Sequence, residues 1–253
     1  MINTAKASSE ELKTCKNCGT DYKGNYCNYC GQKSDIERLN LKYLLHNLFH
    51  ATTHLDAGYF YTLKELAFRP GHFIREYLQG KRSNHGDPVL MLLILGGICS
   101  VLYNHYQLKT LSSVDISTFK GDMQMFSLKF FALAFLGYSF LFSLADFFIF
   151  RYKGYNYIEL YVMNLFACIE ILFLFILLVP FWLFFKTSDI YTYLSLLVIF
   201  SVLCYLVFVR YQFFEVAADK KAKYRIYLDT LVIIVVLVVA GWKTWQKLFL
   251  LNA

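Results

Sequence analysis

The sequence predicts an all-α polytopic membrane protein with about five transmembrane helices, a small N-terminal ribbon and interfacial amphipathic helices between them. Three observations lead to this fold class. The 253 residues are 57% hydrophobic and only 17% charged, whereas a typical soluble domain carries roughly 25% charged residues. Almost half of the 25 Lys and Arg residues precede residue 88, and long apolar runs follow it. Four cysteines stand in two close pairs near the N-terminus.

These features divide the chain into three parts. We expect residues 1–35 to form the ribbon, residues 36–87 to form interfacial helices with a basic collar, and residues 88–253 to form the membrane domain. The opening MINTAKASSEELK lacks an apolar core, so no cleavable signal peptide is expected. The net charge of +7 follows the predicted membrane topology, and nucleic acid is therefore not an expected partner.

The ribbon is marked by the spacing C-x2-C-x8-C-x2-C, formed by Cys15, Cys18, Cys27 and Cys30. Each pair precedes a glycine, Gly19 or Gly31, which permits the tight turn behind two thiolates. Two such pairs predict one tetrahedral, structural Zn2+ site that leaves no open position for a substrate. Iron in the same site and two disulfides are the alternatives. The short ribbon has little core, so the metal would supply most of its stability.

Residues 39–55, LNLKYLLHNLFHATTHL, have helical periodicity, with leucines on one face and histidines on the other. A strongly amphipathic helix of this length is typical of a membrane interface. The histidines follow at i, i+4 and i+8: His46, His50 and His54. They could form a second metal site or a catalytic site, completed by His72, His85 or Asp56. The alternative is a polar helix face without a ligand.

A second amphipathic segment occupies residues 58–82. Pro70 can open a short helix and Gly80 can end it, with an apolar stripe from Phe73 to Leu78 between them. This stripe is expected to lie flat at the cytoplasmic interface. Basic residues form a collar before the first long apolar run: Arg69, Arg75, Lys81 and Arg82. They are expected to contact lipid phosphates or acidic groups of a partner, either as a general anchor or as a specific phosphate site.

The paired CxxCG knuckles, the amphipathic stretch and the run RPGHFIREYLQGKR at residues 69–82 resemble a family of bacterial membrane proteins. This family, common in Bacteroidota, is defined only as domain of unknown function 3667. The resemblance covers the ribbon and residues 40–90, and beyond them only the general pattern of spans. The sequence departs from it at RSNHGDP, residues 82–88, where an aromatic-rich approach to the proline is expected. The resemblance implies an inner-membrane location and no biochemical activity.

Five apolar runs predict the spans, at about 88–106, 130–150, 157–185, 190–209 and 226–246. A cytoplasmic ribbon would place 19 of the 25 basic residues inside and six outside. The positive-inside rule therefore predicts a cytoplasmic N-terminus and an external C-terminus. A reducing cytoplasm in turn favours thiolate–zinc binding over disulfides.

Three acidic residues lie in the predicted spans: Asp146, Glu159 and Glu170. The first two stand near the cytoplasmic ends, within reach of Arg151 and Lys153, and are interpreted as interfacial. Glu170 lies near the middle of its span, where a carboxylate is costly and suggests a function. It is expected to be protonated, to be hydrogen-bonded to Asn164, Cys168 or a tyrosine, or to meet a partner subunit.

The sequence contains no HExxH, GxSxG, P-loop or paired-carboxylate motif, so an enzyme is not the favoured interpretation. We expect a non-enzymatic accessory or scaffold subunit of an inner-membrane protein complex. Its zinc ribbon would dock a cytoplasmic or membrane partner, and its spans would contact the lipid bilayer and another membrane protein. One alternative is a transport-related subunit that uses Glu170. Another is a lipid-active membrane enzyme that uses the face of His46, His50 and His54.

Overall fold

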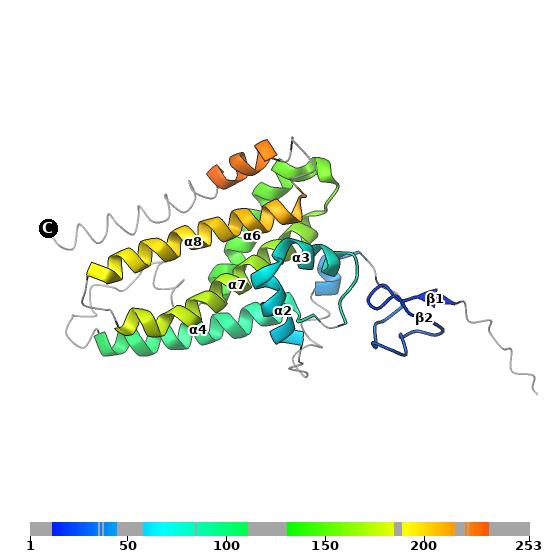
Figure 1. Cartoon of the computed structure of the whole chain (residues 1–253), viewed down its shortest axis with the longest axis horizontal. Coiled ribbons are helices and arrows are strands. Elements are labelled where there is room, and N and C mark those ends of the chain that lie inside the picture. The colour runs from blue at the N-terminus through cyan, green and yellow to red at the C-terminus, as the bar shows by residue number, and fades with distance from the viewer. Residues whose placement is uncertain are drawn as a thin grey trace, which may run out of the picture.

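The computed structural model describes residues 12–34, 36, 38–44, 58–83, 85–110, 131–184, 189–215, 221 and 223–232. These residues form a helical bundle with a small two-stranded ribbon at one end, the same end at which the short helices α2 and α3 lie (Figure 1). The elements are β1 (Lys13–Thr14), β2 (Asp21–Tyr22), α2 (Gly58–Phe68), α3 (Pro70–Leu78), α4 (Pro88–Thr110), α6 (Phe131–Phe150), the 3-10 helix η3 (Arg151–Lys153), α7 (Tyr157–Phe184) and α8 (Asp189–Phe213). A further helical segment covers residues 223–232.

Helix α7 is the centre of the bundle. It packs against α4 and α6 along their lengths, while α3 packs on α8. Its fully buried side chains are those of Leu160, Val162, Met163, Leu165, Phe166 and Ile169. Most of the apolar stretch Tyr157–Leu178 of α7 is therefore covered by protein, although Leu177 is exposed, whereas α6 leaves most of its apolar surface exposed.

Two helical stretches are long and apolar enough to cross a membrane, Ala132–Lys153 and Tyr157–Leu178, each of 22 residues. The apolar parts of α4 and α8, Pro88–Leu102 and Leu197–Phe213, are shorter. Helices thus occupy the first four predicted apolar runs, and two of them meet the length and hydropathy that a span requires. Of the fifth predicted run, only residues 226–232 belong to the described residues, and they are helical.

The ends of α3 follow directly from its sequence. Pro70 occupies the first turn, where its missing N–H costs no hydrogen bond. Gly80 ends the helix with a φ of +106°, a conformation that residues with a Cβ rarely adopt. Both boundaries confirm the prediction from sequence. The start of α4 has a capping residue as well, because Oδ1 of Asp87 accepts the backbone N–H groups of Val89 and Leu90, each at 3.0 Å.

The apolar stripe of α3 faces protein rather than lipid, which differs from the flat interfacial position expected from the sequence. Phe73, Ile74 and Tyr77 are all at most 2% exposed. The rings of Phe73 and Tyr77 meet the ring of Phe166 on α7 edge-on, with centroids 5.4 and 5.1 Å apart. The bundle itself offers an apolar surface to the stripe, and protein therefore replaces lipid as its partner.

The contact between α3 and α8 depends on a glycine. The backbone N–H of Gly71 donates a hydrogen bond to Oε1 of Gln212 at 3.1 Å. A Cβ at Gly71 would overlap the backbone nitrogen of Phe213 and the side chain of Gln212. The two helices can therefore approach this closely only with a glycine at this position.

We predict that Gly71→Ala lowers the free energy of unfolding by about 1–3 kcal/mol, the usual cost of overpacking a tight contact. Thermal unfolding of the purified protein in detergent measures the effect. Gly97→Ala is the control, because a Cβ on that glycine of α4 meets no atom within 4 Å. Alanine also favours a helix over glycine, so Gly97→Ala should be neutral or stabilising. Equal stability of the two variants would contradict the close approach.

Candidate functional site

The two cysteine knuckles are built in the same way. In the first, the N–H of Cys15 donates to the carbonyl of Thr20 at 3.0 Å, and in the second the N–H of Cys27 donates to the carbonyl of Gln32 at 2.8 Å. Gly19 and Gly31 close the two turns with N–H···O=C bonds of 2.9 Å back to these cysteines, and their φ angles are +74° and +71°. Both glycines therefore adopt a left-handed backbone conformation, which favours glycine over residues with a Cβ.

The flanking strands repeat the same register. Thr14 pairs with Asp21 around the first knuckle, and Tyr26 pairs with Lys33 around the second. Each pair joins the residue before the first cysteine of a knuckle to the third residue after its second cysteine. The knuckles are thus two equivalent halves that face each other across a common centre.

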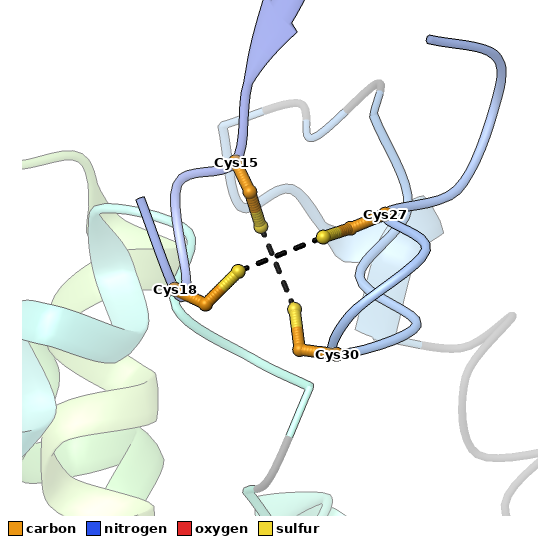
Figure 2. A group of neighbouring side chains, drawn as sticks. All are labelled: Cys15, Cys18, Cys27 and Cys30. Atoms are coloured by element: carbon orange, nitrogen blue, oxygen red, sulfur yellow. Dashed lines mark hydrogen bonds between the residues drawn. The ribbon is translucent and has the colours of Figure 1, made fainter. Parts of the chain in front are cut away.

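The four sulfurs converge on this centre (Figure 2). All lie within 4.8 Å of one another, and Sγ of Cys15 is 3.5 Å from Sγ of Cys30, while Sγ of Cys18 is 3.6 Å from Sγ of Cys27. Four thiolates at about 2.3 Å from one ion in a tetrahedron have sulfurs about 3.8 Å apart. A disulfide needs a separation of about 2.05 Å. The cluster can therefore hold one metal ion in the closed geometry of a structural site.

The surroundings of Cys15 and Cys18 shift the pKa values of their thiols in opposite directions. Burial raises the pKa of Cys15 to about 11. The hydrogen bond with the Thr20 hydroxyl lowers the pKa of Cys18, which is partly exposed, to about 6. A metal ion binds the thiolate form, so binding displaces protons from the cluster, and Cys15 holds its proton most strongly.

We predict about one tightly bound metal ion per chain, measured by elemental analysis of purified protein. The Cys15→Ser/Cys30→Ser variant should lose the ion, whereas Cys204→Ser should retain it because Cys204 lies on α8 outside the cluster. Acidification should release the ion, since protons compete for the thiolates as the pH falls. Metal-free protein with two disulfides would overturn this assignment.

The turn after α3 holds the second knuckle. Oγ of Ser83 donates to the carbonyl of Cys30 at 2.5 Å, and the N–H of Arg82 donates to Oε1 of Gln32 at 3.2 Å. The guanidinium of Arg82 lies over the rings of Tyr43 and Tyr77, 4.6 and 5.3 Å from their centroids. The ribbon is therefore joined to the helical part by specific polar and cation–π contacts.

A second joint connects the end of the ribbon to the start of α7. Arg38 donates from Nε and Nη2 to both carboxylate oxygens of Glu159, at 2.6 and 2.8 Å, and from Nη2 to the carbonyl of Gly154 at 2.8 Å. Asn156 donates from Nδ2 to the carbonyl of Leu39 at 3.1 Å. The sequence placed Glu159 within reach of Arg151 and Lys153. The structure pairs it with Arg38 instead, because residues 38 and 39 lie against this end of the bundle.

We predict that Arg38→Ala loosens this joint and costs about 1 kcal/mol, since the lost hydrogen bonds are charge-assisted but Arg38 is largely exposed to solvent. Amide hydrogen exchange should quicken in residues 38–44 and 154–159. Arg151→Ala is the matched control, because Arg151 is an exposed arginine close to this joint. Unchanged exchange in the Arg38 variant would show that the joint does not hold the segment.

The basic collar is paired within the chain. Arg69 contacts Glu65 and Glu76, and Lys81 lies 3.7 Å from Glu76. The remaining pairs join Arg75 to His72 and to Glu215 after α8. Arg69, Arg75, Lys81 and Arg82 thus help to fix α3 in place. Their contact with lipid or a partner stays a prediction. Such a contact would use only the parts of these side chains that the internal ion pairs leave exposed.

Asp146 does not pair with the loop cations that the sequence suggested. Instead, Arg210 of α8 binds it through Nε···Oδ1 and Nη2···Oδ2 contacts of 3.2 Å each. Nη2 of Arg210 also donates to Oδ1 of Asn164 at 3.0 Å, and Nε lies 2.5 Å from Oδ2 of Asp229. All four side chains are buried. We call these four residues the Arg210 cluster.

Sequence reasoning missed this cluster because it assigned Arg210 to a cytoplasmic loop. A usable signal was present, since an acid inside an apolar run needs a partner. Arg210 and Asp146 stand at the same predicted end of their runs. Charged residues should be matched by their predicted depth in the membrane rather than by their distance along the chain. This comparison would have paired Arg210 with Asp146.

Glu170 is 2% exposed near the middle of α7. Among the described residues, none hydrogen-bonds to its Oε2. Two of the partners expected from sequence are occupied elsewhere, because the Asn164 amide donates to Asp146 and Ser143 and the Cys168 thiol contacts Ser139. A protonated carboxyl, a hydrogen bond between its other oxygen and a tyrosine, and a contact with a partner subunit remain the predictions for Glu170.

The histidine face, His46, His50 and His54, lies outside the described residues, as does Asp56. Of the histidines expected to complete a site there, His72 contacts Arg75. The ring of His85 stacks on Phe73 with centroids 4.6 Å apart, and burial lowers its pKa to about 4. His85 is therefore neutral at physiological pH and packs as an aromatic ring.

The fold and the cluster together define a mostly helical protein with two helices that could span a membrane and four cysteines placed to bind a metal ion. Residues 56–99 match the model of a family described as protein of unknown function, DUF3667. The match includes α2, α3 and the first half of α4, and so contains the basic collar and Gly71. No curated protein and no solved structure matches the chain.

Proposed function

We propose that this protein is a non-enzymatic accessory or scaffold subunit of a complex in the bacterial inner membrane. Its ribbon binds Zn2+ and docks a partner, with the N-terminus in the cytoplasm and the C-terminus outside. The observation that carries the proposal is the ribbon itself, a closed four-thiolate site held against the helices with aromatic residues on its outer surface. A closed site has no coordination position for a substrate, so its role is to hold a surface in shape.

The outer surface of the ribbon is suited to a protein partner. Tyr29 is 81% exposed and Tyr26 is 61% exposed, although the ribbon has few other large side chains. Tyrosine supplies a large contact area and a hydroxyl at low cost in conformational entropy, and it is enriched at the centre of interfaces. The contacts of Arg38, Arg82 and Ser83 keep this surface in a fixed position relative to the bundle, which reduces the entropy lost on docking.

A membrane location is supported by the exposed residues of α6. Leu133, Phe140, Leu141 and Phe148 are each more than 50% exposed, while Ser139, Ser143 and Asp146 of the same helix are fully buried. A helix with apolar residues outside and polar residues inside is stable in lipid and unfavourable in water. Five spans, the inner membrane and the inside location of the ribbon are part of this proposal, as is the choice of zinc, which a tetrahedral S4 site in a reducing compartment favours.

The test is purification of the native protein from its membranes in mild detergent, as wild type and as Tyr26→Ala/Tyr29→Ala. We predict that a partner co-purifies in stoichiometric amount with the wild type and that the double variant loses most of it while keeping its metal. Tyr224→Ala is the matched control, because Tyr224 is a 76% exposed tyrosine far from the ribbon in the sequence. A wild-type monomer, or equal retention by all three proteins, would refute the scaffold role.

A second candidate function, participation in transport, has one specific observation in its favour, the buried Glu170, whose Oε2 has no hydrogen-bond partner in the part of the chain that the structure describes. A carboxyl group at such a position can bind and release a proton or cation. Purified protein in lipid vesicles should then conduct protons or a cation, and Glu170→Gln should abolish the flux. Vesicles with no flux above that of empty ones would exclude this role for the chain alone.

A further inference from the structure

The Arg210 cluster contains two carboxylates and one guanidinium. Asp146 comes from α6, Arg210 from α8 and Asp229 from the helical segment 223–232, and their side chains are all at most 1% exposed. With both acids ionised, the cluster carries a net charge of −1 in an apolar surrounding. A buried charge without a partner is strongly unfavourable, so the cluster needs one further positive charge.

The geometry brings the two carboxylates together. Nε of Arg210 lies 3.2 Å from Oδ1 of Asp146 and 2.5 Å from Oδ2 of Asp229, so a single N–H faces an oxygen of each acid. Asp146 is well satisfied, because it accepts hydrogen bonds from Arg210 and Asn164. In contrast, neither oxygen of Asp229 accepts a well-aligned hydrogen bond from the described residues. Two adjacent carboxylates with such unused acceptor positions commonly share one proton.

Among the described residues, the other charged and titratable groups near the cluster do not supply the missing charge. Arg225 lies one turn before Asp229, but its guanidinium donates to the carbonyl of Ile149 and stands over the ring of Tyr152, 4.3 Å from the centroid. On α7, the Cys168 thiol contacts Ser139 and carries no positive charge. A metal cation is disfavoured, because the guanidinium beside the carboxylates would repel it.

We propose that the Arg210 cluster is a proton-binding site inside the helical bundle. At neutral pH, Asp146 and Asp229 hold one proton between them, and Arg210 balances the remaining negative charge. When the proton leaves for water, the cluster becomes negatively charged, and the contacts among α6, α7, α8 and residues 223–232 weaken. The site is separate from the ribbon and does not depend on the scaffold role.

Infrared spectroscopy of the full-length protein in lipid bilayers at neutral pH tests this site. A protonated carboxyl group in an apolar surrounding absorbs as a carboxylic acid, distinct from a carboxylate. We expect Asp229→Asn and Asp146→Asn each to remove this component, because either substitution leaves one carboxylate for one guanidinium. The same substitutions in a Glu170→Gln background separate the signal from any proton held by Glu170.

Thermal unfolding as a function of pH gives a second measurement. The wild type should lose stability progressively as the pH rises above about 4, where an aspartate of the unfolded chain loses its proton, and the loss should end once the shared proton has left the folded protein. Asp229→Asn should flatten this part of the profile. If either asparagine variant fails to fold, the other one is sufficient for both measurements. The proposal is overturned if the acid component is absent from the wild type, or if it persists in an asparagine variant made in the Glu170→Gln background.

Discussion

The helical part of this protein is organised around Arg210. Its guanidinium contacts α6 through Asp146, α7 through Asn164 and the segment 223–232 through Asp229, so one side chain joins four elements. In water such ion pairs contribute little, but removing one partner of a buried pair typically costs about 3–5 kcal/mol. The helices therefore cannot slide or rotate independently at this end without exposing a charge to an apolar surrounding. The register of the bundle follows from that constraint.

Buried polar groups beyond Arg210 also hold the helices of the bundle together. Ser139, Ser143 and Asn164 continue the polar interior from Arg210, linked by hydrogen bonds from Asn164 to Ser143 and from Ser143 to the carbonyl of Ser139. Outside, α6 and α8 present large apolar side chains such as Phe148 and Phe200. In a lipid environment, interior polar groups hold helices together because no water competes for their hydrogen bonds.

Local features of the sequence predicted local structure well. Pro70 and Gly80 set the ends of α3 through their own backbone preferences, and the cysteine spacing predicted a cluster within a stretch of sixteen residues. The long-range pairs could not be found in this way. Arg38 and Glu159 are 121 residues apart, and Arg210 and Asp146 are 64 apart, so their meeting depends on how complete helices pack. Hydropathy places a helix at a depth, but it does not say which neighbour that helix faces.

The short connection between α3 and α4 has a consequence for metal binding by the cysteine cluster. The same turn that ends α3 at Gly80 and begins α4 at Pro88 also binds Cys30 and Gln32 of the second knuckle. If the cysteines bind a metal ion, its occupancy and the conformation of this connection are thermodynamically linked, and the linkage is reciprocal. Any event in the bundle that stabilises the present conformation of the connection would then raise the affinity of the cluster for the ion. Loss of the ion would, in turn, make the start of α4 easier to move.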